Sequence, residues 1–232
     1  MLNIVSIIGC GLIGSSILRA IQNKNLANEV RIFDLSKDAI AYLKKENICS
    51  NISTDIRHCV KDSDLIIIAT PLSSYKEIIL SIKDNLKKGT ILTDTGSVKK
   101  EVMKIIHNIN LKDVNWIPSH PIAGTEESGP KAGHAEIFEN RWCIISPPKD
   151  ADAQAIKTVK LLWEAIGSKV KIMTPEEHDE ILSLTSHLPH AIAYNIVRTV
   201  INVEDKLKQE VIQYSAGGLR DFTRIASSNP LM

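Results

Sequence analysis

The feature that most constrains this sequence is a glycine-rich turn after its first apolar run. Residues 9–14 read Gly-Cys-Gly-Leu-Ile-Gly, directly after the apolar residues 3–8 and at the start of an amphipathic stretch. Three glycines so spaced permit a tight turn, close approach of a pyrophosphate, and close packing of a helix on a strand. A second apolar run ends about 20 residues later in Asp34, where a carboxylate can accept hydrogen bonds from ribose hydroxyls. Together they predict a dinucleotide site; the alternative is an ordinary glycine turn and an ordinary strand-end acid.

The wider pattern predicts two domains of different class. Over the first two thirds of the chain, short apolar runs alternate with longer amphipathic stretches, which is typical of parallel strands covered by helices on both faces. From about residue 174 the pattern becomes helical, and no further strand is expected. We therefore predict an α/β fold, with a Rossmann-type, doubly wound, mostly parallel sheet in residues 1–173 and a smaller all-helical domain in residues 174–232. Strands are expected near residues 3–8, 29–34, 64–69, 90–94, 115–119 and 142–146, and helices near residues 12–23, 37–46, 75–84, 98–108 and 152–166.

Charge and cysteine usage exclude several classes of partner and location. The chain has 28 Lys and Arg against 27 Asp and Glu, a formal net charge of +1, and no long block of like charge. We therefore expect neither nucleic acid nor a membrane surface as a partner. The apolar runs are far shorter than the ~20 residues of a membrane span, and the N-terminus lacks the features of a secretory signal. The 4 cysteines contain no Cys-x-x-Cys pair and are expected to be free thiols, so a cytoplasmic location is predicted.

Two further loops are expected beside the glycine turn, because in such sheets ligands bind where the strands end. Thr70 and Pro71 close one apolar run, and residues 94–97 close the next. Plain turn chemistry is the alternative for Thr70 and Pro71. Asp34 predicts NAD rather than NADP, since its carboxylate would repel a 2′-phosphate. The cofactor contacts expected from these patterns are Gly9, Gly11, Leu12, Ile13, Gly14, Asp34, Thr70 and Pro71.

Beyond the glycine turn, four segments resemble the prephenate/arogenate (cyclohexadienyl) dehydrogenase family and occur in the family's order. They are residues 94–99 (Asp-Thr-Gly-Ser-Val-Lys), 119–126 (Ser-His-Pro-Ile-Ala-Gly-Thr-Glu), 186–191 (Ser-His-Leu-Pro-His-Ala) and 217–226 (Gly-Gly-Leu-Arg-Asp-Phe-Thr-Arg-Ile-Ala). The resemblance implies an NAD-dependent enzyme of tyrosine biosynthesis acting on prephenate or arogenate. It implies hydride transfer from the ring C4 to the nicotinamide, with loss of the ring carboxylate as carbon dioxide.

By this resemblance two residues are catalytic. His120 matches the family's catalytic base, and an ordinary histidine pKa of ~6.5 leaves it largely neutral near neutral pH. A structural hydrogen-bonding role is the alternative for a lone histidine in a loop. Ser97 matches the family serine that orients the histidine and contacts the nicotinamide side, and its hydroxyl can both donate and accept. Its alternative is the N-cap of a helix that starts at Val98.

The resemblance also implies substrate contacts from the second half of the chain. His190 is expected to touch the substrate with support from His187, and Arg224 to clamp a carboxylate, although a surface ion pair with Asp221 is its alternative. A metal site at the two histidines is not expected, because no carboxylates match and hydride transfer needs no Lewis acid. Pro189 should kink its helix. Glu126 and Thr125 are expected at the substrate side of the site, whereas His178, His107, His58 and His134 are read as surface or structural residues.

Relatives of this family continue beyond the equivalent of residue 232 into further helices, so we expect a fragment or a shortened product. A homodimer is expected if those helices are present. A competing hypothesis is a catalytically incompetent dinucleotide-binding remnant, which would bind NAD without turnover. A β-hydroxyacid dehydrogenase would want a lysine in the long helix, where this chain has His187 and His190.

Overall fold

The computed structural model describes residues 1–125, 127–203, 205–215 and 217–226. The chain divides into two compact units, Met1–His178 and Asp179–Met232. The expected boundary between residues 173 and 174 stays a prediction. Within the described part of the chain, no helix is both long and apolar enough to cross a membrane.

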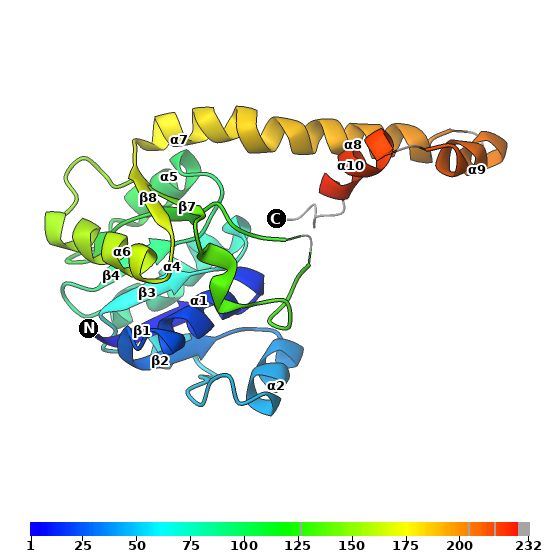
Figure 1. Ribbon diagram of the computed structural model, residues 1–232. Coiled ribbons are helices and arrows are strands. Elements are labelled where there is room, and N and C mark those ends of the chain that lie inside the picture. The colour runs from blue at the N-terminus through cyan, green and yellow to red at the C-terminus, as the bar shows by residue number, and fades with distance from the viewer. Residues whose placement is uncertain (126, 204, 216, 227–232) are drawn as a thin grey trace. The chain divides into compact units, whose positions relative to one another are not determined.

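Five parallel strands form the central sheet of the first unit, in the order β2-β1-β3-β4-β5 (Figure 1). The order changes direction between β1 and β3, and ligands of such sheets bind outside the carboxyl ends of the strands at this point. The predicted parallel Rossmann-type sheet is therefore confirmed. The strands are β1 (Leu2–Ile8), β2 (Ala27–Phe33), β3 (Leu65–Ile68), β4 (Ile91–Asp94) and β5 (Asn115–Trp116).

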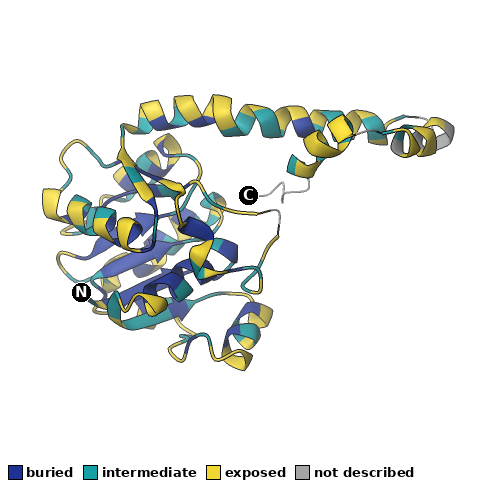
Figure 2. Ribbon diagram, viewed as in Figure 1, coloured by how far each residue is buried: buried dark blue, intermediate teal, exposed yellow. Residues whose placement is uncertain are grey.

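Successive side chains of the strands belong to two separate hydrophobic cores, because alternate residues of a strand point to opposite faces of the sheet. Ile7 belongs to the core that includes α1 and α6, and Ile8 to the core that includes α4 and α5. All four residues of β3 are buried, which explains its unbroken apolar run (Figure 2). The helices of this unit are α1 (Leu12–Asn23), α2 (Lys37–Lys45), α3 (Ile56–Val60), α4 (Tyr75–Ile82), α5 (Lys100–Ile109) and α6 (Ala153–Ala165). Three short 3-10 turns cover Leu72–Ser74, Lys83–Asn85 and Ala135–Phe138.

A second, three-stranded sheet lies beyond the first and differs from the expectation. It contains β6 (Ser119–Pro121), β7 (Trp142–Ile145) and β8 (Lys169–Ile172), with β6 antiparallel and β8 parallel to β7. The single strand expected near residues 115–119 is therefore wrong, since β5 and β6 lie in different sheets. Pro118 stands between them, and a proline has no amide hydrogen to continue a ladder.

The second unit is helical, as expected. Helix α7 (Pro175–Leu182) leads into it, followed by a π-helical turn (Ser183–His187), α8 (Leu188–Ile201), α9 (Asp205–Gln213) and α10 (Gly217–Ile225). Pro189 lies in the first turn of α8, where its missing amide costs least. The π-helical turn ends directly before α8, the helix in which Pro189 lies. Helix α10 packs against α8 (Figure 1).

Candidate active site

Each glycine of the turn after β1 meets a different demand. Gly9 has a φ of 90°, a left-handed conformation that side-chain-bearing residues rarely adopt. At Gly14 an added Cβ would overlap the carbonyl oxygen of Gly9, so α1 can approach the turn only without a side chain there. At Gly11 an added Cβ would meet no atom within 4 Å. The chain's own packing therefore does not require glycine at this position, whereas close approach of a pyrophosphate would.

Asp34, just after β2, fastens this turn to the neighbouring strand. Its carboxylate accepts hydrogen bonds from the amides of Cys10 at 2.6 Å and Ser36 at 2.7 Å. Each carboxylate oxygen has a second lone pair, which leaves Asp34 able to accept from ribose hydroxyls. Burial, and then the negative charge of Asp34, raise the pKa of the Cys10 thiol to about 12. Cys10 is therefore a protonated packing residue at neutral pH.

The loop after β3 borders the glycine turn. The methyl carbon of Thr70 lies 2.6 Å from where a Cβ on Gly9 would be, and the Thr70 hydroxyl accepts a hydrogen bond from Ser74 at 2.8 Å. Pro71 is exposed and precedes the 3-10 turn Leu72–Ser74. Both residues thus have turn roles, and their expected contact with a cofactor stays a prediction.

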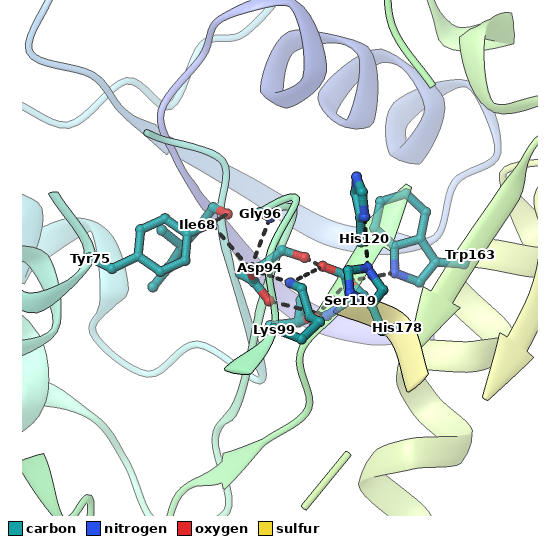
Figure 3. Close-up of polar contacts among 10 residues, drawn as sticks. Ile68, Tyr75, Asp94, Gly96, Lys99, Ser119, His120, Trp163 and His178 are labelled. Carbon is teal, nitrogen blue, oxygen red and sulfur yellow. Dashed lines mark hydrogen bonds and ion pairs between the residues drawn. The ribbon is translucent and has the colours of Figure 1, made fainter. Parts of the chain in front are cut away.

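A buried ion pair lies at the carboxyl end of β4 (Figure 3). Nζ of Lys99 is 2.6 Å from Oδ2 of Asp94, and both side chains are 0% exposed. The same carboxylate oxygen accepts hydrogen bonds from the Tyr75 hydroxyl at 3.2 Å and the Gly96 amide at 2.9 Å. Burial and the nearby Asp94 raise the pKa of Tyr75 well above its usual value, so the phenol remains a donor. One cation and two hydrogen-bond donors therefore compensate the buried carboxylate.

This ion pair fixes the position of Ser119, the residue before His120. The Ser119 amide donates to Oδ1 of Asp94 at 3.1 Å, and its hydroxyl donates to the Asp94 carbonyl at 2.6 Å. Its own carbonyl accepts from Nζ of Lys99 at 2.7 Å, and its hydroxyl accepts from the Trp163 indole at 3.1 Å. Both backbone groups and the side chain of Ser119 are thus held. We infer that this network fixes the position of the backbone from which the His120 side chain extends.

His120 is partly buried on β6, opposite Ile144 of β7. Its Nδ1 atom lies 2.9 Å from Nε2 of His178, a fully buried residue of α7, and the two rings meet edge to face with centroids 5.1 Å apart (Figure 3). The sequence reading gave His178 no role in the site. These two histidines are 58 positions apart and lie on a strand and a helix, so no local pattern connects them.

Ser97 and Thr125, two further predicted residues of the first unit, lie outside its helices and strands. Ser97 is exposed, and α5 begins at Lys100 with Lys99 as its N-cap residue. The alternative reading of Ser97 as an N-cap is therefore wrong. Thr125 is exposed and accepts a hydrogen bond from the Glu127 amide at 3.3 Å. Glu126 lies outside the described residues.

Three predicted residues belong to the second unit. Nδ1 of His190 lies 2.8 Å from the Ser186 carbonyl, which can only accept, so Nδ1 carries the proton and Nε2 of the neutral ring is an acceptor. His187 is partly buried in the π turn, and Arg224 is exposed on α10, the helix that packs against α8. Among the residues that the structure describes, no three His, Cys, Asp or Glu side chains gather closely enough to hold a metal ion.

Comparison with known families decides the identity. Residues 17–172 match the nucleotide-binding domain of prephenate dehydrogenase, and residues 174–232 match its dimerization domain. The chain belongs to the prephenate dehydrogenase family. The first unit is therefore a nucleotide-binding domain that contains Asp34, Asp94, Lys99 and His120.

Relatives of this prephenate dehydrogenase family member match nearly all of the chain. It is 40% identical over 226 residues to a cyclohexadienyl dehydrogenase of Zymomonas mobilis, covering 97% of this chain and 77% of that protein. It is 31% identical to the prephenate dehydrogenase of Bacillus subtilis, covering all of this chain and 62% of that protein. A solved prephenate dehydrogenase from A. aeolicus, in complex with hydroxyphenyl propionate and NAD+, superposes with a TM-score of 0.90 at 31% identity, covering 100% of this chain and 80% of that one.

The family's cofactor can be tested against the residues of this chain. The open position at Gly11, the left-handed Gly9, the close contact at Gly14 and the carboxylate of Asp34 together form a turn with the shape and acceptors that a dinucleotide needs. α1 has no side-chain cap at Gly11, so no side chain competes with a phosphate at that helix end. The residues present fit NAD.

Proposed function

We propose that the chain is an NAD-dependent dehydrogenase of tyrosine biosynthesis that oxidises and decarboxylates prephenate, arogenate or both. The observation that carries this proposal is the anchoring of His120. Asp94 and Lys99, at the carboxyl end of β4, hold Ser119 and so keep the neighbouring histidine at the edge of the sheet where the glycine turn also lies. A base and a cofactor turn at one sheet edge suit removal of a proton from a hydroxyl group and of a hydride from the carbon that carries it.

The cofactor would be held by the glycine turn and Asp34, with Thr70, Pro71 and Ser97 along the nicotinamide side. Bound NAD would accept the hydride that leaves C4 of the ring. Asp34 would favour NAD over NADP, because its charge repels a 2′-phosphate.

His120 would act as the general base. We propose that it takes the proton of the C4 hydroxyl on Nε2 as the hydride leaves. The ring carboxylate then departs as carbon dioxide, and its bonding electrons make the ring aromatic and place a negative charge on the C4 oxygen. The imidazolium of His120 would return its proton there. Ser97 would orient His120 from the cofactor side.

The substrate's carboxylates and hydroxyl need polar partners. We assign Arg224 to a carboxylate, because a guanidinium matches a carboxylate with two parallel hydrogen bonds. The unprotonated Nε2 of His190 suits a substrate hydroxyl, and His187 would support it from the π turn. Thr125 and Glu126 would border the substrate from the loop after β6.

Assembly and location form the last part of the proposal. We propose a homodimer formed through the second unit, which matches the family's dimerization domain. That unit exposes large apolar side chains, as an interface would before it is covered. They include Leu184, Leu188, Ile192, Ile201 and Phe222. Four buried free thiols suit the reducing conditions of a cytoplasmic location.

The deciding experiment mixes the purified chain with NAD and adds prephenate or arogenate in separate reactions, following nicotinamide reduction by absorbance. Reduction with either compound is the expected result and identifies the preferred substrate. Calorimetry with NAD alone runs in parallel. Tight NAD binding without reduction by either compound would contradict the proposed activity and favour the binding remnant.

A further inference from the structure

We propose that His178 is a positioning residue that keeps the proton of neutral His120 on Nδ1 and thereby leaves Nε2 unprotonated and able to accept the substrate proton. The proposed hydrogen bond concerns only the two rings. The effect of that hydrogen bond on catalysis rests on the proposed function of His120 as the base.

The contact between the rings is short and buried. Nδ1 of His120 and Nε2 of His178 are 2.9 Å apart, within normal hydrogen-bond distance, and His178 is 0% exposed. The rings lie at 61° to each other, so one nitrogen points at the other and the rings do not stack. A fully buried imidazole is costly unless its polar atoms are bonded, which gives His178 a reason to hold this partner.

His178 is itself held firmly by the start of α7. Thr174 and Glu177 form a reciprocal capping box, in which the Glu177 carboxylate accepts from the Thr174 amide at 2.8 Å and the Thr174 hydroxyl accepts from the Glu177 amide at 3.2 Å. The His178 amide then donates to the Thr174 carbonyl at 3.0 Å. This capped turn directly follows β8, which pairs with β7, the strand that also pairs with the strand of His120. Both rings are therefore supported by one small sheet.

Only one of the two facing nitrogens can carry the shared proton. If His178 donates from Nε2, Nδ1 of His120 is an acceptor, its proton sits on Nε2, and the neutral ring cannot accept at the outward position. If His120 donates from Nδ1, its Nε2 is unprotonated and can accept. Base catalysis at Nε2 therefore requires the second arrangement, with His178 as the acceptor. When the substrate O–H bond breaks and the Nε2–H bond of His120 forms, the Nδ1 proton stays where it was.

Two substitutions separate positioning from simple support of the fold. His178→Leu removes the acceptor, whereas His178→Gln keeps an oxygen that can occupy the place of Nε2. We expect His178→Leu to lower kcat by about tenfold or more, as loss of the correct tautomer does in other histidine bases. The KM for prephenate and the Kd for NAD should change less than about twofold, because neither ligand is proposed to touch His178. His178→Gln should recover kcat to within about threefold of the unchanged chain.

A variant pair and a spectrum complete the test. In a His120→Asn background, His178→Leu should have no further effect on kcat, since the base that it positions is gone. Long-range 1H–15N spectra of the histidine-labelled chain should find neutral His120 protonated on Nδ1, and a mixture of tautomers in His178→Leu. The spectrum needs no turnover, so an inactive chain would contradict the proposed function and leave the tautomer measurable. A proton on Nε2 of neutral His120, or unchanged kcat in a folded His178→Leu variant, would overturn the inference.

Discussion

Asp94 and Lys99 form an ion pair in the interior of the first unit, with 2.6 Å between Oδ2 and Nζ and no exposure of either side chain. Removing one partner leaves a buried charge without compensation. We expect Lys99→Met to lower the free energy of unfolding by about 3–5 kcal/mol, measured by urea denaturation. Because Lys99 also donates a hydrogen bond to the Ser119 carbonyl, the kcat of Lys99→Met should fall as well.

Lys104→Met is the matched control for that substitution. Lys104 lies in the N-terminal half of α5, the helix whose N-cap residue is Lys99, but its pair with Glu101 is exposed, with a nitrogen to oxygen distance of 3.6 Å. Such pairs contribute about 0–1 kcal/mol. Equal losses for the two variants would show that the buried pair has no special role.

His120→Asn tests the proposed base. Asparagine keeps polar atoms near Nδ1 but has no group that can take a proton at Nε2. We expect kcat to fall by about two or more orders of magnitude, with little change in the KM for prephenate. Steady-state kinetics with NAD at saturation measure both constants, and near-normal turnover would exclude His120 as the base.

The glycine turn offers a matched pair of alanine substitutions. Gly14→Ala places a Cβ against the Gly9 carbonyl and should destabilise the fold by about 1–3 kcal/mol. Gly11→Ala meets open space in the chain, so its stability should change by less than about 1 kcal/mol. Its NAD affinity should nevertheless fall by about tenfold or more, because the methyl group enters the expected pyrophosphate position. Thermal unfolding and calorimetry separate the two effects; unchanged NAD binding in Gly11→Ala would contradict the assignment of the turn.

Asp34→Asn should shift cofactor preference toward NADP. The substitution removes the charge that repels a 2′-phosphate but keeps one oxygen for the Cys10 amide. We expect the NADP to NAD ratio of kcat/KM to rise by about tenfold. Asp38→Asn, in the first turn of α2, makes the same change in net charge away from the turn and should leave the ratio unaltered. Equal use of both cofactors by the unchanged chain would remove the basis of this prediction.

Asp64 should make stability depend on pH in acid. Burial acts to raise the pKa of its carboxyl group, but hydrogen bonds from Lys87 and from the amides of Asn3 and Ile4 outweigh burial and lower the pKa below 3.8. Because the folded-state pKa is the lower one, the unfolded chain binds the proton more readily. This contribution is therefore present above the unfolded pKa and is lost as pH falls through the folded pKa. Asp64→Asn should be less stable by about 1 kcal/mol near neutrality, with the difference closing below about pH 4.

Urea denaturation at several pH values checks that prediction. Asp113→Asn serves as control, because its pair with Lys88 is exposed at 3.8 Å and asparagine accepts its positive φ of 55°. If the difference in free energy of unfolding between Asp64→Asn and the unchanged chain persisted at pH 2, the proposed charge effect would be wrong.

Local patterns in the sequence were enough for the parallel sheet and the glycine turn. The run at β3 is buried on both faces, so its apolar residues needed no alternation to identify it. β8 was missed because it is a short strand with mostly exposed residues, and its pattern of two lysines and two apolar residues is no stronger than that of a loop. Pro118 is visible in the sequence, but that the chain changes sheets there depends on contacts distant along the chain.

The site was only partly predictable for the same reason. His120 could be assigned because its flanking residues resemble a family motif. Lys99 lay inside another such motif, yet the sequence alone did not indicate that its charge is buried against Asp94. The role of His178 could not be predicted from the sequence, because its contact with His120 joins a strand and a helix that are 58 positions apart.

The π turn at Ser183–His187 changes which way the rest of that helix faces. A π turn acts as one residue inserted into an α-helix, and each residue of an α-helix advances the direction of its side chain by about 100°. Every side chain of α8, His190 included, is therefore rotated by about that angle relative to α7 from where an uninterrupted helix would point it. A deletion of one residue in this turn would keep the helix but would redirect the whole face that α8 presents, so the number of residues between Ser183 and Pro189 sets a direction as well as a distance.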